Sequence, residues 1–130
     1  MTEFRKTLGI DFGTKRVGLA LSYGTLAEPL QILANDDQLF AALQQVIAQH
    51  KVQSVVVGIS ESKTAEKTVS FVTELEKHLS IPVYLTDETL STKDARAKLQ
   101  AQGMNAYQAD KAQVDHYAAA GILQEWLDTR

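Results

Sequence analysis

The sequence contains no cysteine and only two prolines among its 130 residues. The absence of cysteine excludes disulfide bridges and thiolate metal sites, and it fits a reducing compartment. No apolar run approaches the roughly 18 residues that a membrane span needs. The first residues, Met1–Thr7, lack the apolar stretch of a signal peptide. We therefore expect a cytoplasmic protein with no membrane segment.

An excess of positive charge is also missing. The chain has 13 basic and 16 acidic residues, which give a formal net charge of −3 at pH 7. Domains that bind nucleic acid through overall electrostatics are basic, so any phosphate contact here must come from local basic clusters and metal ions. The content of 45% apolar and 22% charged residues is that of a globular protein. With no repeat or linker, we expect a single domain over residues 1–130.

Apolar patterning predicts three strands at the beginning of the sequence. The runs Leu8–Phe12 and Val17–Tyr23 are joined by a short turn that begins at Gly13, which predicts a β-hairpin. Pro29–Leu33 is predicted as a third, edge strand. Pro29 is expected at its start, where a missing N–H matters least.

Helices and strands are predicted to alternate after the hairpin. Asn35-Asp36-Asp37 predicts the N-cap of a helix that ends near His50. A polar segment, Ser60–Lys67, precedes a second helical stripe around Phe71 and Leu75. We expect further strands over Ser54–Ile59 and Pro82–Thr86, and closing helices over about 93–102 and 109–127. The order is strand–strand–strand–helix–strand–helix–strand–helix–helix, an α/β fold with a mixed five-stranded sheet and helices on both faces.

Acidic residues stand at three positions where function is a plausible explanation. Asp11 lies inside the apolar segment of the first strand, where an ionised and unpaired carboxylate would cost several kcal/mol. Asp87 and Glu88 follow a strand, where open α/β sheets place their ligand sites. Asp115 lies within a strongly apolar helix. Three such acids suit a site for Mg²⁺ or Mn²⁺, and two ions about 3.5–4 Å apart support phosphodiester hydrolysis.

Taken one at a time, most of these acids have ordinary explanations. Asp115 alone fits a helix-surface residue or an ion pair with Lys111, four residues earlier. Asp87 and Glu88 alone fit loop acids that cap the following helix. Only the position of Asp11 indicates function by itself.

Three motifs add a specific resemblance. They are Gly9-Ile10-Asp11-Phe12-Gly13-Thr14-Lys15-Arg16-Val17-Gly18-Leu19-Ala20, then Asp87-Glu88-Thr89-Leu90-Ser91-Thr92, then Lys111-Ala112-Gln113-Val114-Asp115-His116-Tyr117-Ala118-Ala119-Ala120. In order and spacing they resemble the motifs of the YqgF/RuvX family of Holliday-junction-resolvase-like proteins. The likeness covers nearly the whole chain.

The resemblance implies an RNase H-like fold and a metal-dependent endonuclease that matures pre-16S ribosomal RNA, a step of ribosome biogenesis. It implies that Asp11, Glu88 and Asp115 are the catalytic carboxylates and hold Mg²⁺ or Mn²⁺. Asp87 replaces Glu88 if the second motif is read one residue early.

Two departures from the family pattern bear on the substrate. Residues 58–64 replace the usual Leu-Pro and glycine-containing loop, and Thr89 stands where the family has arginine. Both changes remove features suited to holding a substrate.

Several residues near the acids suit phosphate binding. Thr14, Lys15 and Arg16 lie on the hairpin turn beside Asp11, where turn amides can meet a phosphate. Ser91 and Thr92 place hydroxyls and a helix N-terminus beside Glu88. Backbone contacts that position a strand could come from Lys93, Arg96, Lys98 and Lys111.

Three other functions compete with RNA processing. Asp11-Phe12-Gly13-Thr14 also resembles the first phosphate loop of actin-like and hexokinase-like ATPases, but those bind ATP between two such domains. A non-catalytic nucleic-acid-binding module would fit the negative charge, although it would not need three acids. Resolution of four-way DNA junctions would use the same chemistry and predicts a homodimer, whereas an RNA nuclease could act as a monomer.

Overall fold

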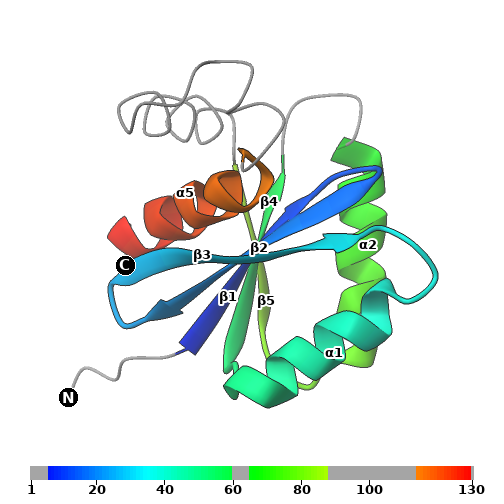
Figure 1. The fold of residues 1–130 in the computed structure, drawn as a ribbon, viewed down its shortest axis with the longest axis horizontal. Helices are drawn as coiled ribbons and strands as arrows, with labels where there is room; N and C mark the ends of the chain where they lie inside the picture. The colour runs from blue at the N-terminus through cyan, green and yellow to red at the C-terminus, as the bar shows by residue number, and fades with distance from the viewer. Residues whose placement is uncertain (1–5, 60–64, 88–113, 130) are drawn as a thin grey trace.

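The computed structural model describes residues 6–59, 65–87 and 114–129. Its elements are β1 (Lys6–Phe12), β2 (Arg16–Tyr23), β3 (Leu26–Ala34), α1 (Leu39–His50), β4 (Ser54–Ile59), α2 (Ala65–His78), β5 (Val83–Asp87) and α5 (Val114–Asp128) (Figure 1). This order confirms the prediction over the described ranges. The helix expected over 93–102 and the first residues of the last helix lie outside them.

The five strands form one mixed sheet in the order β3-β2-β1-β4-β5. β1 is central: it pairs antiparallel with β2 and parallel with β4, which pairs parallel with β5. Because β1, β4 and β5 run in the same direction, their last residues meet at one edge of the sheet. We call this the carboxyl edge, defined by Phe12, Ile59 and Asp87.

Helices cover both faces of the sheet, as predicted. α1 and α2 lie on one face and α5 lies on the other (Figure 1). The α1/α2 face holds the larger core, in which buried aliphatic side chains from β1, β2 and β4 meet both helices. Its fully buried members are Leu8, Ile10, Val17, Leu19, Leu43, Val55, Val57 and Leu75.

The α5 face is built from smaller residues. Its buried cluster contains Ala20, Val56, Ala119, Ile122 and Leu123, with Tyr84 and Trp126 packed against it. Small side chains on the sheet allow a helix backbone to come close to the strands. None of the helices in the described ranges is long and apolar enough to cross a membrane.

Pro29 does not begin its strand. It is the fourth residue of β3 and pairs with Ala20, while Gln31 pairs with Leu19, so the register shifts between these two pairs. The missing N–H of Pro29 is accommodated because β3 is an edge strand with an irregular register at this point. The edge position was predicted correctly, but the place of the proline in the strand was not.

The start of α1 also differs from the prediction. Gln38 is the N-cap residue, and it makes no side-chain capping bond. Asp36 instead accepts a hydrogen bond from the N–H of Gln38, at 2.9 Å from its Oδ1. The acidic cluster therefore shapes the turn before the helix. α2 begins at Ala65, inside the segment read as polar, and β5 extends one residue beyond the prediction, to Asp87.

Candidate active site at the carboxyl edge

Asp11 is the last but one residue of the central strand, and its side chain is half-buried. It pairs with Gly18 on β2 and with Gly58 on β4. Neither neighbouring strand therefore presents a side chain at the positions paired with Asp11. The register leaves space around this carboxylate that larger residues would fill.

Strand alternation places Asp11 on the α5 face. Ile10 belongs to the core under α1 and α2, and successive strand residues point to opposite faces. Gly9, two residues before Asp11, faces α5: a Cβ added there would lie 2.8 Å from the Cβ of Leu123 and 3.1 Å from the carbonyl oxygen of Ala119. Only glycine permits this contact between strand and helix.

The direction of α5 brings its first turn to the carboxyl edge. At its other end, the Gln124 amide accepts a hydrogen bond from the N–H of Ala27 at 2.9 Å and donates one to the carbonyl of Thr25 at 2.8 Å. Those residues lie at the start of β3, far from the carboxyl edge. The helix therefore runs from the carboxyl edge towards the opposite edge and crosses Gly9 on the way.

Asp115 is the second residue of α5. It precedes Ala119 by one turn, a rise of about 6 Å, and Asp11 follows Gly9 by about 7 Å of strand. The two displacements run towards the same edge. The backbone of position 115 and Asp11 thus share one face and one edge of the sheet, while the Asp115 side chain lies outside what the structure describes.

The second acidic motif begins where β5 ends. Asp87 is the last residue of β5, and its backbone pairs with Ile59 of β4. Glu88, the residue predicted as a ligand, lies outside the described residues, as do the predicted substrate contacts Ser91, Thr92, Arg96 and Lys111.

The turn between β1 and β2 holds the remaining predicted substrate contacts. Thr14, Lys15 and Arg16 are exposed at the carboxyl edge. Asn35 stabilises the turn: its side-chain amide donates to the carbonyl of Gly13 at 2.7 Å, and its backbone N–H donates to that of Lys15 at 3.0 Å. A Cβ on Gly13 would lie 2.5 Å from the Arg16 carbonyl oxygen, so this tight turn requires glycine.

The chemistry of the predicted site is that of carboxylate oxygen. Among the residues whose side chains are described, no three His, Asp or Glu groups gather into a metal site. Asp11 is the one predicted acid whose side chain is described. Hard carboxylate ligands on separate elements suit Mg²⁺ or Mn²⁺ better than a softer metal.

Sequence reasoning missed two features of the site. Gly18 and Gly58 matter because they flank Asp11, and that follows only from the strand register. Asn35 was interpreted as part of a helix cap, whereas it stabilises the hairpin turn. Its only signal in the sequence is a polar side chain at the end of a strand.

Comparison with known proteins identifies the family. The sequence model described as "RuvX: Holliday junction resolvase" matches residues 5–129. The chain belongs to the RuvX family. A RuvX relative from Anaeromyxobacter dehalogenans (strain 2CP-1), named "Putative pre-16S rRNA nuclease", is 36% identical over 96% of this chain and 98% of its own length. One of the same name from Legionella pneumophila (strain Lens) is 38% identical over 92% and 93%.

Solved structures confirm the fold of this RuvX chain. Thermus thermophilus RuvC, in complex with a Holliday junction, matches with a TM-score of 0.60 over 96% of this chain and 95% of that chain, at 19% identity. The fowlpox virus resolvase bound to junction DNA matches with a TM-score of 0.60 over 95% and 97%, at 12% identity. The RNase H-like fold implied by the motifs is therefore correct.

Proposed function

We propose that this protein is a metal-dependent endonuclease that hydrolyses phosphodiester bonds in the maturation of pre-16S ribosomal RNA. The observation that carries the proposal is Asp11, a half-buried carboxylate at the end of the central strand, flanked by two glycines. The first turn of α5, which carries Asp115, reaches the same edge and face. Relatives over 35% identical across nearly the full chain bear the name of a pre-16S rRNA nuclease. This role implies a cytoplasmic location.

Asp11, Glu88 and Asp115 are the proposed ligands of Mg²⁺ or Mn²⁺. The divalent ions would neutralise the carboxylates and stabilise the charge that develops on the phosphate. Glu88 is preferred to Asp87 because the resemblance carries the acid of the second motif over to position 88, and Asp87 replaces it only if that motif is read one residue early.

The chain's own residues bind and orient the substrate. Lys15 and Arg16, on the turn stabilised by Asn35, contact the phosphate backbone, which positions a strand without reading its sequence. Gly18 and Gly58 leave room for a phosphate to approach Asp11. With the turn and the carboxylate at one edge, the scissile bond of a bound strand would lie against the α5 face.

Replacing Asp11 by asparagine tests the proposal. Asparagine keeps the size of the side chain but removes its charge, so we expect cleavage of a labelled pre-16S fragment with Mg²⁺ or Mn²⁺ to fall at least about 100-fold, a typical cost of losing one charge-stabilising group. EDTA should abolish cleavage by the unmodified protein. Asp37→Asn, at an exposed position outside the site, is the matched control. Cleavage by Asp11→Asn at the rate of the unmodified protein would refute this mechanism.

A second candidate, resolution of four-way DNA junctions, is favoured by the description of the family model and by the fold of the junction resolvases. The same assay should include a labelled junction and a linear duplex of equal length. Paired cuts in the junction, together with a dimer mass in light scattering, would establish this function in place of RNA processing. Preference for the pre-16S fragment would exclude it.

A further inference from the structure

A groove lies at the carboxyl edge on the face opposite Asp11. It has a volume of about 490 Å³ and is formed by the end of β1, the loop between β3 and α1, the start of α1 and one side of α2. Among the described residues, none of the predicted catalytic or substrate residues lines it.

The floor of the groove is aromatic. The rings of Phe12 and Phe71 stack with their centroids 4.4 Å apart, and Phe40 stacks on Phe71 at 5.7 Å. Phe71 is only 5% exposed, so its ring faces are covered by its neighbours. Phe71 therefore offers little free ring face for stacking a nucleobase, and the half-buried rings of Phe12 and Phe40 complete the apolar floor.

The rim of the groove is acidic. Within the described part of the chain, Asp36, Glu66 and Glu74 line it with three carboxylates, against one ammonium group, that of Lys67. All four residues are exposed. Asp36 and Glu66 stand at the N-terminal ends of α1 and α2, where the helix dipole favours their negative charge.

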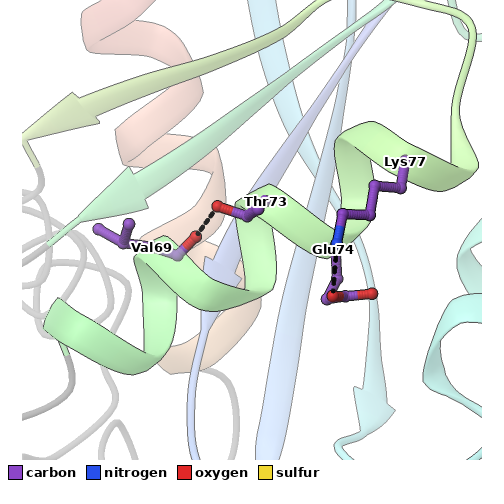
Figure 2. Close-up of polar contacts among 4 residues, drawn as sticks. All are labelled: Val69, Thr73, Glu74 and Lys77. Atoms are coloured by element: carbon purple, nitrogen blue, oxygen red, sulfur yellow. Dashed lines mark hydrogen bonds and ion pairs between the residues drawn. The ribbon is translucent and has the colours of Figure 1, made fainter.

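One rim carboxylate has a partner on its own helix. Glu74 forms an ion pair with Lys77 at 3.3 Å, and both side chains are more than half exposed (Figure 2). Exposed pairs of this kind contribute little to stability, so a cation from a partner can replace Lys77 at low cost. Thr73, by contrast, donates its hydroxyl to the carbonyl of Val69 at 3.0 Å and takes no part in the groove.

We propose that this groove binds a basic segment of a partner protein, in which an apolar anchor residue is flanked by lysines or arginines. The anchor packs on Phe12, Phe40 and Phe71, and the flanking cations pair with the rim carboxylates. The acidic rim repels a phosphate backbone, which disfavours RNA as the occupant. Buried apolar anchors inside a charged rim are the usual arrangement of a protein interface. The proposal does not depend on nuclease activity, because binding is measured without RNA or metal.

The probe is a fluorescein-labelled peptide with a central tryptophan and lysines on both sides, and binding is followed by fluorescence anisotropy. Glu66→Lys/Glu74→Lys should raise its Kd about tenfold or more, because the cations lose their partners. Glu28→Lys/Glu76→Lys is the matched control: both positions are exposed and lie outside the groove, and the net charge changes equally. An equal loss of peptide affinity in both double variants would overturn the proposal.

A second pair of variants tests the groove without changing charge. Ser70 lines the groove and is exposed, so Ser70→Trp should fill it and weaken binding by about tenfold. Thr73→Trp, on the same helix but outside the groove, should leave binding unchanged. Circular dichroism and thermal melting check that all variants are folded.

Three further outcomes would refute the proposal. These are no binding of the peptide up to about 1 mM, equal binding of a peptide with glutamates in place of the lysines, and equal binding of one with alanine in place of tryptophan. Tighter binding of a single-stranded RNA hexamer, lost in Ser70→Trp, would show instead that the groove is a nucleotide site.

Discussion

The two faces of the sheet are packed in different ways. The α1/α2 face buries bulky aliphatic side chains such as Leu19 and Leu43, whereas the α5 face brings a helix backbone close to the strand at Gly9. The first face removes much apolar area from water and should contribute more to stability. The second fixes the height of α5 above β1. The comparison indicates that one face stabilises the fold and the other sets the geometry of the candidate site.

The largest effect on stability is expected from Leu43→Ala. Leu43 is fully buried under the sheet, so its truncation leaves a cavity and should lower the free energy of unfolding by about 2–5 kcal/mol. Denaturant unfolding measures the change. Since Leu43 lies on the face away from Asp11, the cleavage rate per folded molecule should stay close to that of the unmodified protein. A large drop in that rate would show that the two faces do not have separate roles in stability and in the geometry of the site.

Compared with Leu43→Ala, Gly9→Ala should have a smaller effect on stability and a larger effect on cleavage. Its Cβ would lie 3.1 Å from a helix carbonyl and 2.8 Å from the Leu123 Cβ, and relief requires α5 to move. We expect a smaller loss of stability, about 1–3 kcal/mol, as found for overpacked cores. Displacement of the first turn of α5 should lower the cleavage rate per folded molecule about 10- to 100-fold. Unchanged cleavage would show that the height of α5 does not matter to the site.

The smallest effect is expected from Ser22→Ala on the α5 face. The Ser22 hydroxyl is fully buried, and within the described ranges it has no hydrogen-bond partner. Removing it should raise the free energy of unfolding by up to about 1 kcal/mol. Ser54→Ala is the contrasting variant, because the Ser54 hydroxyl shares a 2.9 Å hydrogen bond with that of Thr7. Its loss should lower stability by about 1 kcal/mol. Equal midpoints of thermal unfolding for both variants would contradict the conclusion that, among the described residues, the Ser22 hydroxyl is unpaired and the Ser54 hydroxyl is paired.

Local patterns in the sequence were enough to predict much of the fold. The β-branched run gave the strand Ser54–Ile59 with its observed bounds, and the apolar spacing after Asp37 gave the helix that ends at His50. The extent of β3 could not be predicted, because the strand is defined by its pairing with β2, whose register shifts beside Pro29. The start of α2 was missed because its first turn carries no apolar stripe: Glu66 and Lys67 are exposed, and the buried residue of that turn is the polar Thr68.

The candidate site was predictable only in part. Asp11 stood out because an acid inside an apolar strand needs a partner, and its place at the carboxyl edge agrees with that interpretation. Glu88 and the side chain of Asp115 lie outside the described residues, so their roles stay predictions. The importance of Gly9, Gly18 and Gly58 arises from pairing between distant segments, which no local pattern encodes. The acidic groove was equally hidden, since its lining comes from three separate stretches of the chain.

The docking of α5 also has a consequence for how the molecule forms during synthesis. The hydrogen bond between Ala27 and Gln124 joins residues 97 positions apart, and α5 covers strands that a ribosome makes long before it. Until α5 has left the exit tunnel, the face that carries Asp11 stays uncovered by its helix. A nascent chain of this protein therefore cannot yet bring the first turn of α5 to the edge that carries Asp11, even when the hairpin of β1 and β2 has already formed.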